Sequence, residues 1–115
     1  MTLTKEWFDT LPTPCWLKDI NGYIIYVNTS YIDLFGLPDN ILTSNCPQDI
    51  WGEKTSEEFA LSEAKVIETD EPLYLFEKIV IPSTQENKMA NMIKWPLHDK
   101  NGTIVGVVGI ILNAF

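Results

Sequence analysis

Residues 15–36 read CWLKDINGYIIYVNTSYIDLFG, and this stretch largely decides the fold. Asn21-Gly22 separates two apolar runs and supplies the positive φ angles of a type I′ turn, which predicts a β-hairpin. Asn28 stands where a helix N-cap is expected, and Gly36 stands just past the last apolar position, where a helix should end. The expected elements are strands at 15–19 and 23–28, and a helix whose apolar positions are Tyr31, Leu34 and Phe35.

A second hairpin is expected near the C-terminus. Asp99-Lys100-Asn101-Gly102 repeats the turn signal and joins apolar runs at 92–98 and 104–112. One more strand is expected at 73–81, where β-branched and aromatic residues alternate between two faces. A polar loop at 83–88 follows it. One face of that strand is expected to hold Leu73, Leu75, Ile79 and Ile81, and the other Tyr74, Phe76, Lys78 and Val80.

Helical segments are expected at the N-terminus and between the hairpins. Thr55 and Glu58 have the spacing of a capping box, which predicts a helix from 56 to 69. Its mostly apolar face is expected to hold Phe59, Ser62, Ala64, Val66 and Ile67. Single helical turns are expected at 38–42 and 47–51, and an amphipathic helix at 4–11 carries Trp7, Phe8 and Leu11. Helices segregated from an antiparallel sheet indicate one α+β domain over 1–115.

The composition excludes several classes of protein. The chain has 115 residues and a net charge of −8, and 45% of its residues are hydrophobic, enough for one packed core. So acidic a surface disfavours direct contact with nucleic acid or with a membrane. The first residues lack the basic and apolar parts of a signal peptide. Two distant cysteines, Cys15 and Cys46, are typical of free thiols in a reducing compartment, which favours a cytoplasmic location.

The order and spacing of these elements resemble the PAS family over roughly residues 4–113. The motifs that carry the resemblance are Leu11-Pro12-x-Pro14-x-Trp16-x-Lys18-Asp19-x-Asn21-Gly22-x-Ile24-x-Tyr26-Val27-Asn28, Tyr31-x-x-Leu34-Phe35-Gly36, Glu68-Thr69-Asp70-Glu71-Pro72, and Lys94-Trp95-Pro96-Leu97-His98-Asp99-Lys100-Asn101-Gly102-x-Ile104-x-Gly106-x-Val108-Gly109-Ile110. The resemblance implies a PAS core at 14–113 after the N-terminal helix, with five antiparallel strands in the spatial order 2-1-5-4-3 and short helices over one face of the sheet.

The resemblance also implies a role. PAS domains, with their associated PAC motif, sense small molecules, redox state or light through a cavity between sheet and helices, and they signal to a C-terminal output domain, often as dimers. We therefore expect an input module of a bacterial signal-transduction protein, such as a two-component histidine kinase, a diguanylate cyclase or a transcription regulator. This segment itself is expected not to be an enzyme. The output domain is expected to follow Asn113-Ala114-Phe115, where family members often have Asp-Ile-Thr.

Haem and covalent flavin photochemistry are disfavoured, and the cofactor is left unknown. Asn45-Cys46 resembles the start of the reactive-cysteine segment of light-sensing relatives, but the arginine that meets the flavin phosphate is missing, and Ile111 stands in place of a glutamine. The helix expected at 56–69 has no histidine for haem iron, and His98 falls in a polar turn. One histidine and two distant cysteines give no metal-ligand spacing and little means for acid–base catalysis.

A ligand cavity is the remaining candidate site. The residues expected to line it are Phe59, Val66, Ile67 and Lys94. Adjacent residues of a strand face opposite sides, so either Lys94 or Trp95 points inward. An inward Lys94 would be a buried cation that needs an anionic partner, such as a carboxylate ligand. In the alternative arrangement Lys94 faces solvent and Trp95 fills the core.

Two functions stay open at this point, beside the disfavoured alternative of a flavin- or haem-binding sensor. In the first, the domain senses a small molecule. In the second, it is a ligand-free dimerisation or relay domain, and its homodimer interface is formed by Trp7, Phe8 and Leu11, because exposed aromatic side chains on a terminal helix tend to mark interfaces. A cavity filled by the domain's own side chains would favour the second function.

Overall fold

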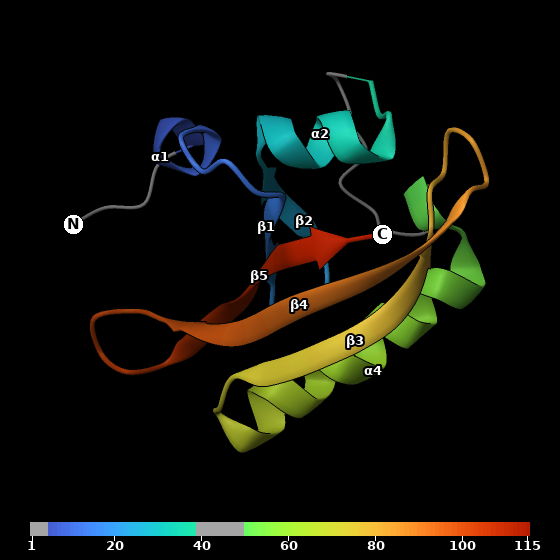
Figure 1. The fold of residues 1–115 in the computed structure, drawn as a ribbon. Helices are drawn as coiled ribbons and strands as arrows, with labels where there is room; N and C mark the ends of the chain where they lie inside the picture. Colours follow the sequence, from blue (N-terminus) through green and yellow to red (C-terminus); the bar gives the residue numbers. More distant parts are fainter. Residues whose placement is uncertain (1–4, 39–49) are drawn as a thin grey trace.

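The computed structural model describes residues 5–38 and 50–115. Its elements are α1 (Lys5–Asp9), β1 (Cys15–Asp19), β2 (Ile24–Val27), α2 (Thr29–Phe35), α4 (Glu53–Thr69), β3 (Leu73–Val80), β4 (Asn87–His98) and β5 (Ile104–Ala114) (Figure 1). The helical turn expected at 38–42 and most of the one expected at 47–51 fall outside the described residues. None of the described helices is long and apolar enough to cross a membrane.

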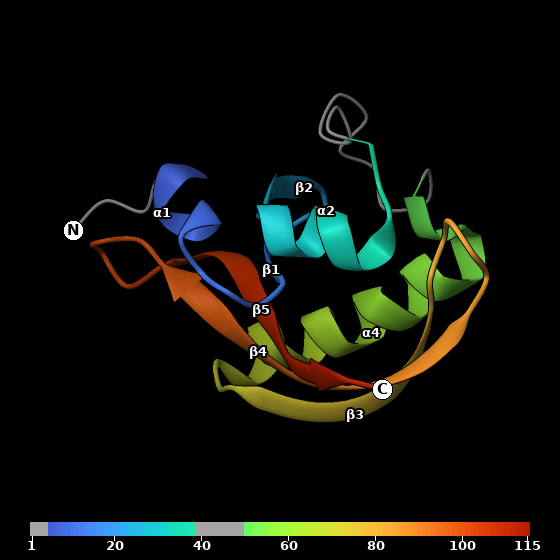
Figure 2. The ribbon, with the colours of Figure 1, turned by 45° about the horizontal axis from the view of Figure 1, so that its top comes forward.

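The five strands form one antiparallel sheet in the order β2-β1-β5-β4-β3, which confirms the expected fold. Figure 2 shows α4 lying across the sheet, with β3 and β4 curving around it and α2 beside it. The helix α1 lies away from α4 in both ribbon views. The sheet therefore has one face under α2 and α4, and another that is free for α1.

Strand alternation builds a separate hydrophobic cluster on each face of the sheet. The inner cluster lies under α2 and α4, and its buried members are Trp16, Ile24, Val27, Tyr31, Phe35, Ile79, Ile81, Ala90, Met92 and Ile111. The outer cluster holds Phe8, Cys15, Leu17 and Val108, with Leu11, Tyr26, Trp95, Leu97 and Ile110 packed against them. Because α1 supplies Phe8, the N-terminal helix covers the face opposite α4.

Both hairpins have the expected strands, but the predicted type I′ turns are wrong. In the first hairpin the left-handed φ of 89° belongs to Gly22 alone, and Asn21 does not share it. The carboxylate of Asp19 instead accepts hydrogen bonds from the backbone N–H groups of Asn21 and Tyr23, at 2.8 and 3.1 Å. The turn is closed by a hydrogen bond of 3.0 Å from the N–H of Gly22 to the carbonyl oxygen of Asp19, and Gly22 takes the left-handed conformation. The second hairpin repeats it around Asp99, with hydrogen bonds of 2.8 and 3.0 Å.

The predicted capping box at Thr55 and Glu58 is also wrong. The helix begins earlier, at Glu53, after Gly52, whose φ is 83° and which makes no side-chain cap. Thr55 is therefore already helical and cannot act as an N-cap. Ala64, expected on the apolar face, is exposed. The helix ends at Thr69 as expected.

The bounds of α1 and β4 also differ from expectation. The helix α1 ends at Asp9 rather than at residue 11. The strand β4 begins at Asn87, before the expected start at 92, because Asn87 to Lys94 pair continuously with β3 and extend the ladder into the expected polar loop.

The side chain of Asn28 joins four segments of the N-terminal half. It is fully buried, and its Oδ1 accepts hydrogen bonds from the backbone N–H groups of Cys15 at 2.9 Å and Tyr31 at 3.0 Å. Its Nδ2 donates to the carbonyl oxygens of Phe8 at 3.1 Å and Thr13 at 2.8 Å. The predicted N-cap is therefore confirmed, and the same amide also holds α1 and β1 in place.

Replacing Asn28 with alanine should destabilise the whole domain. The change removes the cap of α2 and takes the Asn28 amide away from the buried backbone N–H of Cys15 and from the carbonyl oxygen of Thr13, so we expect the free energy of unfolding to fall by about 3 kcal/mol. Urea denaturation followed by circular dichroism measures this. Asn101→Ala, in the exposed second turn, is the matched control and should change stability by less than about 0.5 kcal/mol. Equal losses in the two variants would contradict this role for Asn28.

Candidate functional site

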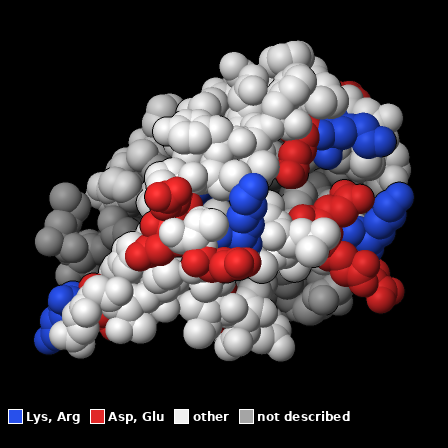
Figure 3. Space-filling model, turned by 90° about the horizontal axis from the view of Figure 1, so that it is seen from below, with Lys and Arg blue, Asp and Glu red and all other residues white. Residues whose placement is uncertain are grey.

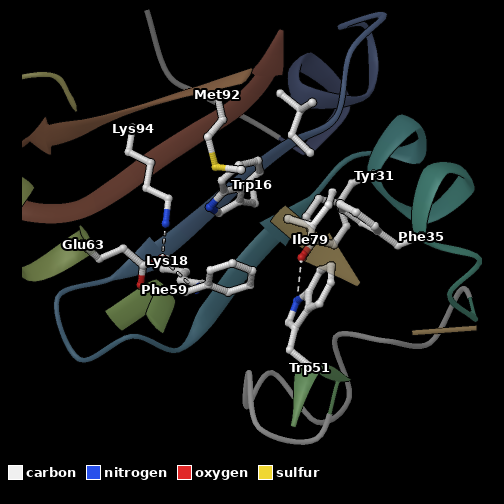
Figure 4. Close-up of a pocket in the computed structure, with 11 residues that line it drawn as sticks. Trp16, Lys18, Tyr31, Phe35, Trp51, Phe59, Glu63, Ile79, Met92 and Lys94 are labelled. Carbon is white, nitrogen blue, oxygen red and sulfur yellow. Dashed lines mark hydrogen bonds and ion pairs between the residues drawn. The ribbon is translucent and has the colours of Figure 1, made fainter. Parts of the chain in front are cut away.

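A cavity lies between the inner face of the sheet and α4 (Figure 4). Its free volume is about 20 Å³, room for roughly one water molecule, so the side chains around it largely fill it. The lining combines aromatic, charged and aliphatic side chains: Trp16, Tyr31, Phe35, Trp51 and Phe59; Lys18, Glu63 and Lys94; and Ile79, Met92 and Ile111. Charged groups in so apolar a space need an explanation.

The alternation of the central strands places two lysines on the inner face. Lys18 follows Trp16 by two residues on β1, and Lys94 follows Met92 by two residues on β4, so each lysine shares its neighbour's face. The strand β5 runs between β1 and β4, and its Gly109 pairs with both Trp16 and Lys94. A Cβ at Gly109 would lie 2.2 Å from Cζ2 of Trp16, so only glycine lets this indole lie over β5.

One carboxylate oxygen pairs with both lysines. Oε2 of Glu63, on α4, lies 2.8 Å from Nζ of Lys18 and 3.2 Å from Nζ of Lys94. Lys94 also donates to Oγ of Ser62 at 2.8 Å. The exposed fractions of Lys18, Glu63 and Lys94 are 4%, 6% and 1%, so all three charged groups are almost fully removed from water. We call these three residues the charge cluster.

Burial and the neighbouring charges act in different directions on the pKa of Lys94. Burial lowers the pKa of Lys94 from its ordinary value of 10.5; the charge of Glu63 opposes this shift, and the positive charge of Lys18 adds to it. Both ammonium groups lie over the ring of Phe59, at 5.3 Å for Lys18 and 5.1 Å for Lys94 from the ring centroid. The ring face supplies a weak attraction to cations. It therefore contributes a second stabilising contact for both lysines.

Aromatic side chains form the rest of the wall. The indole Nε1 of Trp51 donates to the hydroxyl of Tyr31 at 3.1 Å, as Figure 4 shows. Trp51 also meets the rings of Phe35 and Phe59 edge-on, with centroids 4.7 and 5.3 Å apart. Burial raises the pKa of Tyr31, so its hydroxyl stays protonated at neutral pH. The cavity thus presents two cations at one end and a continuous aromatic surface beside them.

The expected ligand-binding residues are only partly brought together. Phe59 and Lys94 line the cavity, whereas Val66, which is fully buried, and Ile67, which is half-buried, do not. Of the two arrangements left open for β4, Lys94 faces inward and Trp95 packs against the outer cluster.

The residues expected at a dimer interface occupy different environments. Phe8 is buried within this chain and stacks on Tyr26, with ring centroids 5.8 Å apart. Trp7 remains 38% exposed, and Leu11 is half-buried. Trp7 and Leu11 line an apolar groove of about 180 Å³ between α1 and the outer face of the sheet.

The other residues weighed for chemistry are Cys15, His98, Ile111 and Cys46. Burial raises the pKa of the Cys15 thiol to about 12, so it is a poor nucleophile. His98 is partly exposed and pairs with Asp70, with Nε2 and Oδ1 2.6 Å apart. Ile111 lines the cavity, at the position where light-sensing relatives are expected to have glutamine. Cys46 lies outside the described residues.

Sequence reasoning missed Lys18 and Glu63. The signal for Lys18 was its period-two spacing from the apolar Trp16. The signal for Glu63 was its position four residues after Phe59 and three before Val66, which puts it on the same helix face as both. Neither residue is among those expected from the sequence to line the cavity.

Comparisons with known proteins agree on the fold. Residues 8–113 match the family described as PAS fold. No curated protein matches the chain. The PAS domain of Bordetella pertussis BvgS superposes with a TM-score of 0.79 at 18% identity, covering 95% of this chain and 82% of that one. The Vibrio cholerae VqmA dimer superposes with a TM-score of 0.79 at 23% identity, and the match covers 99% of this chain and 52% of the VqmA chain. VqmA bound to DPO gives 0.79 at 22%, covering 96% and 56%, so this chain spans about half the length of VqmA.

Removing the acid or one base of the charge cluster should have unequal effects on stability. Glu63→Gln leaves two buried lysines without their carboxylate, so the free energy of unfolding should fall by about 3–5 kcal/mol. Lys94→Met leaves a balanced Lys18–Glu63 pair and should cost less than about 1 kcal/mol. Thermal and urea denaturation measure both, with Glu57→Gln on the exposed side of α4 as control. The assigned pairing is wrong if Lys94→Met costs as much as Glu63→Gln.

The lowered pKa of Lys94 predicts a pH dependence. Above that pKa the folded chain has lost a proton that the unfolded chain keeps up to 10.5, so a rise in pH should favour folding. The groups that act on Lys94 are Lys18, Glu63 and Glu77. We expect wild-type stability, relative to Lys94→Met, to rise with pH in the interval below 10.5, with a slope of up to about 1.4 kcal/mol per pH unit. A difference that stays flat over this interval would contradict the assignment.

Proposed function

Because this chain belongs to the PAS family, we propose that it is the sensory input module of a bacterial signal-transduction protein and binds a small molecule in the cavity beside α4. The observation that carries this proposal is the charge cluster. Buried ion pairs are often no more stabilising than well-packed apolar side chains, so stability alone is a weak reason to place three charges in a core. Perturbed ionisable groups in a cavity are typical of binding sites.

The neighbours in structure support the same reading. VqmA was solved with DPO bound and also as a dimer. By analogy, our proposal gives this domain a small-molecule ligand and a homodimeric state in the cytoplasm. It assigns no catalysis to this segment; the signal passes to an output domain that follows β5, such as a kinase, a cyclase or a transcription regulator.

A second candidate is a ligand-free relay that works through dimerisation. The small free volume of the cavity favours it, since about 20 Å³ admits no organic molecule unless side chains move. The apolar groove beside α1 also favours it, because Trp7 and Leu11 there are only partly covered by this chain. In this second candidate the outer cluster forms the dimer interface, and the residues around the cavity act only as part of the hydrophobic core.

Native mass spectrometry of the purified domain, beside a denatured control, tests both candidates. We expect a dimer that carries a small bound mass, and the denatured control should release that mass. A dimer without any bound mass would favour the relay. A bare monomer would contradict both candidates for the domain alone.

A surface variant locates the dimer interface in the same experiment. Trp7→Ser should shift the species toward monomer, because it removes the most exposed aromatic side chain of the groove. Leu61→Ser is the matched control, since Leu61 is a large apolar residue on α4 that is 74% exposed and lies far from α1 in the chain. If Leu61→Ser dissociates the dimer and Trp7→Ser does not, the interface lies elsewhere.

A further inference from the structure

The charge cluster is out of balance. Two of the eight lysines of the chain point into the cavity, where a single carboxylate meets them. When both lysines are protonated, Lys18, Glu63 and Lys94 together carry one positive charge that no other described residue of the cavity wall compensates. An uncompensated buried charge is costly, so a group that supplies the missing negative charge would be bound strongly.

Glu77 does not compensate the extra positive charge of the cluster. Its side chain faces the same side of the sheet from β3, and its charge acts weakly on Lys94. It is only half-buried, however, and no ion pair joins it to either lysine in the part of the chain that the structure describes. Its charge is therefore largely screened by water, which a charge inside the cavity would not be.

The lysines also have hydrogen-bonding capacity left. Two ammonium groups offer six N–H donors in all. The contacts with Glu63 and Ser62 are three hydrogen bonds. Among the described residues, the other donors meet only the ring face of Phe59, which is a weak substitute for an acceptor. A second carboxylate could accept from both lysines at once.

We propose that the cavity takes a small organic monocarboxylate with a flat apolar body, whose carboxylate binds Lys18 and Lys94 beside Glu63. One negative charge balances the cluster, whereas a phosphate ester would bring nearly two into an apolar space. The flat body is matched by the rings of Trp16, Tyr31, Trp51 and Phe59. This inference rests on the proposed sensory pocket.

The face of the domain shown in Figure 3 offers little attraction to such an anion, because acidic side chains lie around the basic ones there. The net charge of the chain is −8, which also disfavours anions at the surface. The buried lysines are therefore the better-placed cations for an acid. Room for its body comes from Trp51 and Phe59, the half-buried members of the aromatic wall, because Trp16, Tyr31 and Phe35 are buried in the inner cluster.

The cavity prefers an acid to a neutral ligand whether or not Lys94 is protonated before binding. If Lys94 is charged before binding, the acid neutralises the cluster. If burial beside Lys18 has removed its proton, the incoming carboxylate restores it, and binding takes up one proton. In both cases the bound state contains two cations and two anions. A neutral ligand would add no negative charge to pair with Lys94 in either case.

Matched acids and amides test this proposal on the 115-residue chain. Benzoate and indole-3-carboxylate are compared with benzamide and indole-3-carboxamide by isothermal calorimetry and thermal shift. The acids should bind at least about tenfold more tightly than their amides, the difference expected for a charged hydrogen-bonded pair. Lys18→Met and Lys94→Met should each lose this preference, while Lys65→Met, on the exposed side of α4, should keep it.

A rescue experiment gives an independent readout. Glu63→Gln lacks the internal carboxylate, so benzoate should raise its melting temperature more than that of the wild type, and benzamide should not. If this variant does not fold, the two lysine variants still decide the question, because each leaves the cluster balanced.

The outcomes separate this inference from the proposed function. Amides that bind as tightly as the acids, or a neutral co-purified ligand in native mass spectrometry, would overturn the inference and leave a sensory pocket in place. A domain that binds none of the four compounds and purifies empty would overturn both. A co-purified acid that is lost in Lys94→Met would support both.

Discussion

The carboxylate of Glu63 fixes how α4 meets the sheet. One oxygen accepts from Lys18 on β1 and from Lys94 on β4, two strands that β5 separates. A charge that is buried must find its partners, so this geometry allows little rotation of the helix about its own axis. The position of Phe59 under both ammonium groups, and of the aromatic wall beyond it, follows from the same constraint. The cavity is thus organised by electrostatics, and the apolar side chains pack around that arrangement.

Much of the fold could be predicted because its signals are local. Asn-Gly pairs mark both hairpins, and Asn28 and Gly36 bound α2 where the pattern placed them. The errors arose where a different nearby residue decided the outcome. The carboxylate of Asp19 shapes the first turn more than Asn21 does. The helix α4 begins at Glu53, before the residues that have the spacing of a capping box.

The candidate site was less predictable than the fold. The inward direction of Lys94 was one of two arrangements allowed by strand alternation, and nothing local decides between a lysine and a tryptophan. The decision depends on Glu63, which is 31 residues away in sequence and becomes a neighbour only when α4 crosses the sheet. Lys18 and Glu63 each look like an ordinary surface charge when read alone. They form a charge cluster with Lys94 only when β1, α4 and β4 are placed together.

The two faces of the sheet share one strand as a common wall. Along β1, Cys15 and Leu17 belong to the outer cluster beneath α1, while Trp16 and Lys18 face the cavity. Adjacent residues of one strand are about 3.3 Å apart, so the cavity side and the α1 side of the sheet are separated by a single peptide unit rather than by a chain of packed side chains. A small twist of β1 would therefore move side chains on both faces of the sheet at once. The sheet itself would be the shortest route by which a change in the cavity could displace the N-terminal helix.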